Sequence, residues 1–293
     1  MMKGNICALV TPFVKDKKIS YDKINLLLEK QIYYKSQGFV INGTTAESSN
    51  IKFTEQLRVI KICQKKTKKN FPIIVGIGSS STFDTIRKIE ILSYFKVDAI
   101  LIRSPYYSCP NQTGIIKHYN TISKYSKLPI IIYNVPKRTG IDISYDSICE
   151  ISKNSNVIGI KETSNDLNKI KKISLISNFF LLSGDDELSY NVIANYKAQG
   201  VVSALSNIAP LHIYNMLNFI NHNKNSKAKK IHEDLLYLYK LLNLDINPIP
   251  IKQCLSKLQF ISDVSRLPLI NLSEDNITKL ILYIKKTNWF DIQ

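Results

Sequence analysis

The feature that most constrains the fold is an alternation, repeated along most of the chain, between short apolar runs and longer amphipathic segments. The runs are rich in β-branched residues and apolar throughout, which is typical of parallel strands covered on both faces. We predict strands at Ile6–Val10, Phe39–Ile41, Ile73–Gly76, Ala99–Ile102, Ile130–Tyr133, Val157–Ile160, Phe180–Ser183 and Val201–Ser203.

The segments between these runs have the spacing of amphipathic helices. Examples are Tyr21–Ser36, Thr54–Thr67, Phe83–Phe95, Gly114–Tyr125, Asp166–Ile176 and Leu188–Tyr196. Ser20, Thr54 and Thr82 are the predicted N-caps. About eight βα units in regular order favour a (β/α)8 TIM barrel. A doubly wound open sheet is the alternative, but the nearest match to a dinucleotide fingerprint, residues 76–81, lacks the third glycine.

The strand pattern stops in the last part of the chain. Helices are predicted there at Ser226–Leu242, Ile251–Leu258 and Ser273–Lys286, with Pro248-Ile249-Pro250 as a connection. We therefore predict a barrel over residues 1–223 and a C-terminal helical extension, residues 224–293, packed on it.

Composition limits the class of protein. No apolar run is long enough to cross a bilayer, and no signal peptide is recognised, so we expect a cytoplasmic protein that does not bind membranes. The five cysteines form no C-x-x-C pair, and the four histidines lack metal-ligand spacing, so we expect free thiols and neither a metal nor a cofactor.

The net charge of +17 has two interpretations. A basic surface can bind nucleic acid. Heavy use of Lys, Ile and Asn, with basic residues spread along the chain, instead indicates the codon bias of an AT-rich genome, and we favour this second interpretation.

In a TIM barrel the active site lies at the carboxyl ends of the strands. Lys161 directly follows a predicted apolar strand, so its amine should point into the barrel mouth. Burial favours the neutral amine, which can attack a ketone and form a Schiff base. Tyr133 ends the preceding strand and could transfer the protons. The alternatives are a rim lysine paired with Glu162 or Asp186, and a packing tyrosine.

Residues after two further predicted strands carry groups that could bind carboxylates. Thr44 and Thr45 lie in a turn whose hydroxyls and N–H groups could hold a carboxylate, although plain turn chemistry would explain them too. Arg138 could bind a second carboxylate with two hydrogen bonds, or be a surface arginine.

Together these segments resemble the dihydrodipicolinate synthase/N-acetylneuraminate lyase family, almost from end to end. The matching motifs are Ala8–Pro12, Gly43–Ser48, Ser104–Tyr107, Tyr133–Pro136, Arg138–Gly140, Gly159–Glu162, Leu182–Asp186, Asn247–Lys252 and Arg266–Pro268. The paired threonines and Arg138 favour the synthase branch over the sialic-acid or keto-deoxy-sugar lyases.

The resemblance implies a class I lyase that condenses pyruvate with L-aspartate 4-semialdehyde to 4-hydroxy-tetrahydrodipicolinate, the committed step of lysine and diaminopimelate biosynthesis. It also implies a homotetramer that needs no cofactor and does not bind nucleic acid. In the implied mechanism Lys161 forms the Schiff base, and Tyr133, Thr44 and a neighbouring subunit's Tyr107 transfer protons. Thr45 and Arg138 are implied to bind carboxylates. Gly184 and Val202 are implied to shape the site.

Two departures from the family pattern matter. Ala46 stands where the family usually has glycine, and it would be strained if that glycine has a positive φ. The family's lysine feedback site maps to Ser48, Ser49, Phe53, Gln56, Ser80, Asp84 and Tyr106. Because Phe53 and Ser80 cannot replace the polar contacts of sensitive forms, we expect weak inhibition by lysine or none.

Overall fold

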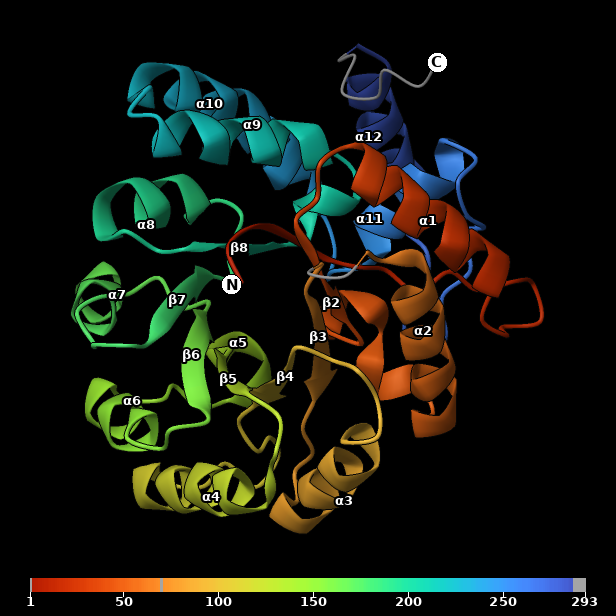
Figure 1. The fold of residues 1–293 in the computed structure, drawn as a ribbon. Helices are drawn as coiled ribbons and strands as arrows, with labels where there is room; N and C mark the ends of the chain where they lie inside the picture. Colours follow the sequence, from red (N-terminus) through yellow and green to blue (C-terminus); the bar gives the residue numbers. More distant parts are fainter. Residues whose placement is uncertain (1, 69–70, 287–293) are drawn as a thin grey trace. The chain divides into compact units, whose positions relative to one another are not determined.

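The structure, a computed structural model, describes residues 2–68 and 71–286. The predicted TIM barrel is confirmed, because eight parallel strands form a closed barrel in the order β1 to β8 (Figure 1). The strands are β1 Gly4–Ala8, β2 Gly38–Ile41, β3 Ile73–Ile77, β4 Ala99–Arg103, β5 Ile130–Asn134, β6 Val157–Glu162, β7 Phe180–Ser183 and β8 Gly200–Ser203.

Helices connect successive strands and then form the C-terminal part of the chain (Figure 1). They are α1 Tyr21–Tyr33, α2 Phe53–Lys66, α3 Thr82–Leu92, α4 Gln112–Tyr125, α5 Pro136–Thr139, α6 Tyr145–Ser152, α7 Leu167–Ile173, α8 Ser189–Tyr196, α9 Pro210–Asn221, α10 Asn225–Leu242, α11 Ile249–Lys257 and α12 Glu274–Lys286.

The chain divides into two compact units, which are described separately. The first comprises Met1–Lys3 and Pro72–Val202, and the second Gly4–Phe71 and Ser203–Gln293. The predicted division into residues 1–223 and 224–293 stays a prediction, although its three C-terminal helices are confirmed as α10, α11 and α12. Residues 287–293 lie outside the described residues.

Helix α4 illustrates how the sequence determines a helix of the barrel. Asn111 begins it, because its side-chain oxygen accepts a hydrogen bond from a first-turn N–H, 2.9 Å away. Ile115, Tyr119 and Ile122 recur at helical spacing and are fully buried. Burying each isoleucine contributes about 1.5–3 kcal/mol, so packing of this face, more than helix propensity, holds α4 in place.

Strand ends differ from the prediction by one or two residues. The first strand ends at Ala8 rather than Val10, because the side-chain oxygen of Asn207 accepts the Val10 N–H at 3.1 Å and takes it out of the ladder. Strands β5 and β6 instead run longer than predicted, so that Asn134, Lys161 and Glu162 lie within the sheet.

The N-caps were partly predicted. Ser20 precedes α1 as expected, but Thr54 and Thr82 are not caps. Lys52 and Ser81 take those positions. The Ser81 hydroxyl accepts a first-turn N–H at 3.3 Å, so the serine one residue earlier does what was assigned to Thr82.

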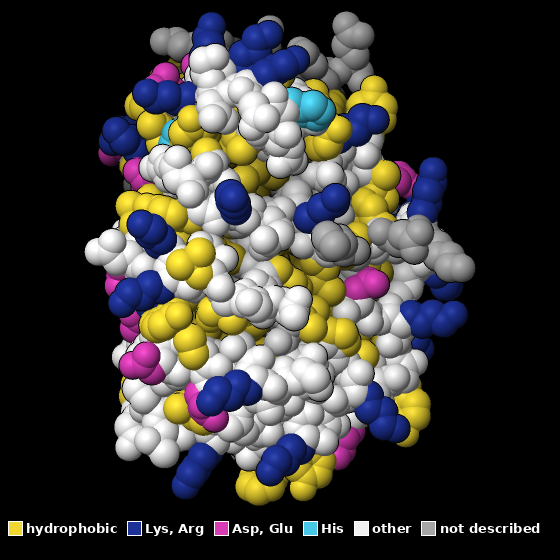
Figure 2. Space-filling view, turned by 60° about the vertical axis from the view of Figure 1, so that its left-hand side comes forward, with side chains coloured by type: hydrophobic (Ala, Val, Ile, Leu, Met, Phe, Trp, Pro, Cys, Tyr) yellow, Lys and Arg dark blue, Asp and Glu magenta, His cyan; other side chains and the backbone are white. Residues whose placement is uncertain are grey.

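No helix within residues 2–68 and 71–286 is long and apolar enough to span a membrane. Lysine and arginine side chains are scattered over the face seen in Figure 2, with acidic side chains among them. On this face the positive charge therefore does not gather into a continuous stripe of the kind that follows a nucleic-acid backbone.

Candidate active site

Lys161 and Tyr133 lie side by side near the carboxyl ends of β6 and β5. They are register partners, so their side chains point to the same face of the sheet. Both are buried, each with 7% of its surface exposed, and Lys161 Nζ lies 4.4 Å from the centre of the Tyr133 ring. A buried amine thus lies over the ring of a tyrosine, and the two residues are candidates for amine attack on a ketone and for the accompanying proton transfer.

The aliphatic part of Lys161 packs against the end of β7. A Cβ placed on Gly184 would lie 2.7 Å from Lys161 Cε and 2.3 Å from Thr163 Cγ2. Any side chain at Gly184 would therefore collide with Lys161. Among the described residues no carboxylate forms an ion pair with Lys161, and Glu162 instead interacts with Lys169, which contradicts the alternative of a salt-bridged rim lysine.

Arg138 lies on the one-turn helix α5, which Pro136 begins and Gly140 ends with a φ of 73°. The residue is exposed, yet partial desolvation of its guanidinium lowers its pKa, and attraction to Tyr133 opposes that shift. Arg138 therefore lies within electrostatic reach of Tyr133 and offers a cation to an anionic substrate.

Tyr107 lies in the loop after β4 and turns outward. It is 95% exposed and has a φ of 72°, which is unusual for an aromatic residue. Two residues on, the Cys109 thiol donates to the Thr139 carbonyl at 3.6 Å, so this loop rests against α5. The tyrosine is thus presented to the surroundings by a loop that is itself anchored.

A second cation on the barrel-lining face was not foreseen. Arg103 ends β4 and is the register partner of Tyr133, so its side chain starts from the same face as Tyr133 and Lys161. Its guanidinium lies 5.0 Å from the Tyr106 ring centre. This strand end therefore adds to the positive charge available to an anionic substrate.

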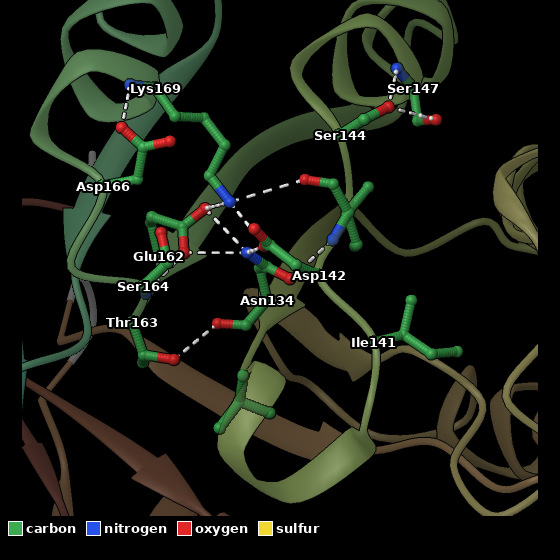
Figure 3. A network of polar contacts seen from close by, with 12 residues as sticks. Asn134, Ile141, Asp142, Ser144, Ser147, Glu162, Thr163, Ser164, Asp166 and Lys169 are labelled. Atoms are coloured by element: carbon green, nitrogen blue, oxygen red, sulfur yellow. Dashed lines mark hydrogen bonds and ion pairs between the residues drawn. The ribbon is translucent and has the colours of Figure 1, made fainter.

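The outer face of the same strand ends carries a buried polar network (Figure 3). Asn134 donates to both carboxylate oxygens of Glu162, at 2.8 and 2.9 Å, and Lys169 Nζ lies 3.5 Å from the same carboxylate. Burial raises the pKa of Glu162, while the Lys169 charge and hydrogen bonds from Asn134 and Ser164 oppose the rise.

In the second unit, Thr44 and Thr45 form the short 3₁₀ turn Thr44–Ala46 after β2. Thr45 is 3% exposed, and its hydroxyl accepts a hydrogen bond from the side-chain amide of Asn247 at 3.0 Å. Ala46 does not have a positive φ, so the condition for strain there is not met, and a φ of 58° occurs instead at the next residue, Glu47. Ala46 is accommodated as a buried residue.

Glu47 is held in its left-handed conformation by groups from the C-terminal part of the chain. Its carboxylate accepts from Lys252 Nζ at 2.6 Å and from the backbone N–H of Arg266 at 3.0 Å. Burial lowers the pKa of Lys252, and the attraction of Glu47 opposes this. The Arg266 guanidinium in turn holds the Glu55 carboxylate with two hydrogen bonds, at 2.6 and 2.8 Å. The loop that contains Thr44 and Thr45 is thus supported by helix α11 and the segment after it.

Known proteins resemble this chain in sequence and in fold. A model of the Dihydrodipicolinate synthetase family matches residues 1–287. This chain belongs to the dihydrodipicolinate synthetase family. The 4-hydroxy-tetrahydrodipicolinate synthase of Wigglesworthia glossinidia brevipalpis is 38% identical over 280 residues, covering 94% of each chain.

Solved structures of the dihydrodipicolinate synthase type agree. The enzyme from Acinetobacter baumannii complexed with pyruvate matches with a TM-score of 0.95 and 32% identity, over 99% of this chain and 100% of that one. The enzyme from Cyanidioschyzon merolae with lysine bound matches with a TM-score of 0.93 and 28% identity, over 97% and 98% of the two chains.

The predicted site residues of this dihydrodipicolinate synthetase family member fall into both units. Lys161, Tyr133 and Gly184 are brought together in the first, and Arg138 interacts with Tyr133 there. Val202 lies buried in β8. Thr44 and Thr45 belong to the second unit. Within residues 2–68 and 71–286, no three His, Cys, Asp or Glu side chains are grouped to hold a metal ion.

Sequence reasoning missed the supporting charges behind these residues. Lys252 and Glu47 have side chains 1% and 0% exposed, and Lys169 is 7% exposed. A signal existed for Lys252, which is the one charged residue in the mostly apolar segment Ile249–Leu255. Nothing comparable marks Lys169, since its helix carries several lysines and only the fold selects one of them.

Proposed function

We propose that this chain condenses pyruvate with L-aspartate 4-semialdehyde to form 4-hydroxy-tetrahydrodipicolinate, the committed step towards diaminopimelate and lysine. The observation that carries the proposal is the contact of Lys161 Nζ with the Tyr133 ring, 4.4 Å apart. Membership of the dihydrodipicolinate synthetase family supports it.

The first half of the reaction uses the lysine as nucleophile. The neutral amine of Lys161 attacks the ketone carbon of pyruvate to form a carbinolamine. Its hydroxyl gains a proton and leaves as water, and a Schiff base remains. Tyr133 carries these protons, since its hydroxyl belongs to the residue packed against the amine. Loss of a proton from the pyruvate methyl group then gives the enamine.

The second half forms the carbon–carbon bond. The enamine carbon attacks the aldehyde carbon of the semialdehyde, and the aldehyde oxygen takes up a proton. The amino group of the semialdehyde then attacks the Schiff-base carbon, closes the ring and displaces Lys161 as the free amine. One water leaves in total, and the enzyme returns to its starting state.

The remaining residues have proposed roles in binding and proton transfer. Thr45 holds the pyruvate carboxylate, and Arg138 binds the carboxylate of the semialdehyde. Thr44 and Tyr107 extend the proton path, with Tyr107 supplied by a neighbouring subunit of a homotetramer. The 95% exposure of Tyr107 supports this last role. Gly184 and Val202 shape the pocket, and we place the enzyme in the cytoplasm.

Borohydride trapping tests the nucleophile. The protein is incubated with pyruvate, reduced with borohydride and digested, and its peptides are weighed by mass spectrometry. We expect the reduced pyruvate adduct on the peptide that contains Lys161, and none in Lys161→Met. A folded wild-type protein without adduct would refute the assignment. Product formation on adding the semialdehyde, lost in Arg138→Leu, then distinguishes this reaction from that of sugar-cleaving relatives.

A further inference from the structure

Behind the lysine and the tyrosine lies a second pair of register partners. Asn134 and Glu162 directly follow Tyr133 and Lys161 and are paired across β5 and β6. Successive side chains of a strand point to opposite faces. Asn134 and Glu162 therefore occupy the outer face, where Figure 3 shows them turned towards Lys169 of α7 and the loop that contains Asp142.

Several hydrogen bonds hold the side chains of this outer pair, Asn134 and Glu162, in place. Asn134 donates to both Glu162 oxygens, at 2.8 and 2.9 Å, and to Asp142 Oδ1 at 2.7 Å. Its own side-chain oxygen accepts the N–H of Ile143 at 3.1 Å. Glu162 also accepts the N–H of Ser164 at 2.7 Å. The Asn134 amide is therefore fully satisfied in a single orientation.

Backbone contacts tie the same strand ends together. Thr163 donates from its N–H and its hydroxyl to the Asn134 carbonyl, at 3.2 and 2.7 Å. The N–H of Gly184 donates to the Glu162 carbonyl at 2.7 Å. The residues that pack on the Lys161 side chain, Thr163 and Gly184, are thus bonded to the residues that form the outer pair.

The outer pair is buried as deeply as the core. Asn134 is 0%, Glu162 2% and Lys169 7% exposed. Burying charge is costly unless each charge is paired and hydrogen-bonded, and a satisfied network holds one arrangement because alternatives leave a group without its partner. Such a network is suited to fixing the position of neighbouring atoms.

We propose that Glu162 is a positioning residue for the reaction proposed above, on which this inference rests. By clamping Asn134 and Ser164 from the outer face, it fixes the ends of β5 and β6. It thereby keeps the Lys161 amine against Tyr133. Lys169 places a positive charge 3.5 Å from the buried Glu162 carboxylate, and Asp142 links Lys169 to the loop.

The experiment compares two variants that weaken the network at different points. Glu162→Leu removes both carboxylate oxygens that accept from Asn134 and Ser164, and leaves Asp142 as the acceptor of the Asn134 amide. Asp142→Ala leaves the Asn134–Glu162 pair in place and removes the half-exposed carboxylate that accepts from both Lys169 and Asn134. Each full-length protein is mixed with pyruvate and quenched with borohydride at successive times. The rate of adduct formation per folded molecule is then measured together with the thermal midpoint.

We expect Glu162→Leu to slow adduct formation at least about tenfold per folded molecule, since misplacing a reacting group by about 1 Å costs up to 10²-fold. Asp142→Ala should lower the thermal midpoint while keeping the wild-type rate. Equal slowing in both variants would mean that the network supports only stability, and would overturn the proposal.

Glu162→Gln keeps the side-chain volume and one acceptor oxygen, and should recover part of the rate. If Glu162→Leu does not fold, a wild-type rate in Glu162→Gln overturns the proposal and a slowed rate supports it. Failure of the underlying reaction is distinguishable, because the wild-type protein itself would then form no adduct with pyruvate.

Discussion

Replacing Gly184 by alanine is expected to displace Lys161, the proposed nucleophile. The new Cβ would lie 2.7 Å from Lys161 Cε and 2.9 Å from its Cγ. Carbon atoms that are not bonded prefer about 3.5–4.0 Å, so the end of the lysine side chain must move by roughly 1 Å. Gly184 does not have a left-handed φ, so backbone strain plays no part and the effect is one of space.

A displacement of this size has a large kinetic cost. Since misplacing a reacting group by about 1 Å can cost 10²-fold, we expect the rate of pyruvate adduct formation in Gly184→Ala to fall by about 10²-fold. Borohydride quenching at successive times gives this rate, and turnover with both substrates should fall by a similar factor.

A second collision provides the control. The same Cβ would lie 2.3 Å from Thr163 Cγ2, so lost activity could reflect a disturbed strand end rather than a moved lysine. Thr163→Ser removes this methyl group and keeps the hydroxyl that donates to the Asn134 carbonyl. The double variant Thr163→Ser/Gly184→Ala should regain thermal stability and remain slow. Wild-type rates in Gly184→Ala, or full recovery of the rate in the double variant, would refute the reasoning.

Three further predictions concern stability and regulation. Lys252→Met leaves Glu47 buried without its countercharge and should cost about 3–5 kcal/mol in the free energy of unfolding, measured by urea titration, with partial recovery when Glu47→Gln is added. Burial lowers the pKa of His118 from 6.5 to about 4. As the pH falls, this histidine therefore takes up its proton in the unfolded chain before it does so in the folded protein. The folded state loses stability between about pH 6.5 and pH 4 as a result. From these values the loss at pH 5 relative to pH 7.5 is about 2 kcal/mol, and His118→Asn should remove that part of the pH dependence. Lysine should inhibit weakly or not at all because Phe53 and Ser80 offer no matching polar contacts, and an inhibition curve with sub-millimolar potency would contradict this.

The barrel and its chemistry could be predicted because both are properties of local sequence. Apolar β-branched runs identify parallel strands without knowledge of their neighbours, and their carboxyl ends then indicate where reactive groups collect. This rule selected Lys161 and Tyr133 as candidates, and the family resemblance supplied their expected roles. The rule misplaced them slightly, since β5 and β6 extend through Asn134 and Glu162. A polar residue can continue a strand when its side chain, on the outer face of the sheet, meets a polar partner. The end of an apolar run in the sequence therefore does not mark the end of the strand.

The supporting residues could not be predicted, because their roles depend on partners that are distant in sequence. Glu47 adopts a left-handed conformation, with a φ of 58°, that a sequence rule assigns to glycine. Contacts with Lys252 and the Arg266 backbone hold it there, and these residues lie some two hundred positions along the chain. A positive φ was considered for Ala46, and it occurs at the next residue, Glu47.

The two buried charge clusters follow the same physical logic. Each unit has a buried carboxylate behind a loop or strand end that carries proposed site residues. This carboxylate accepts a backbone N–H and faces one buried lysine. The pairs are Glu162 with Lys169 and Glu47 with Lys252. An apolar core of the same volume would often be at least as stable. Ionic groups at these places therefore point to precision of position rather than to stability. If so, Lys169→Met and Lys252→Met should reduce turnover per folded molecule by more than an apolar core substitution of similar cost in unfolding free energy, such as Ile122→Ala on α4 at about 2–5 kcal/mol.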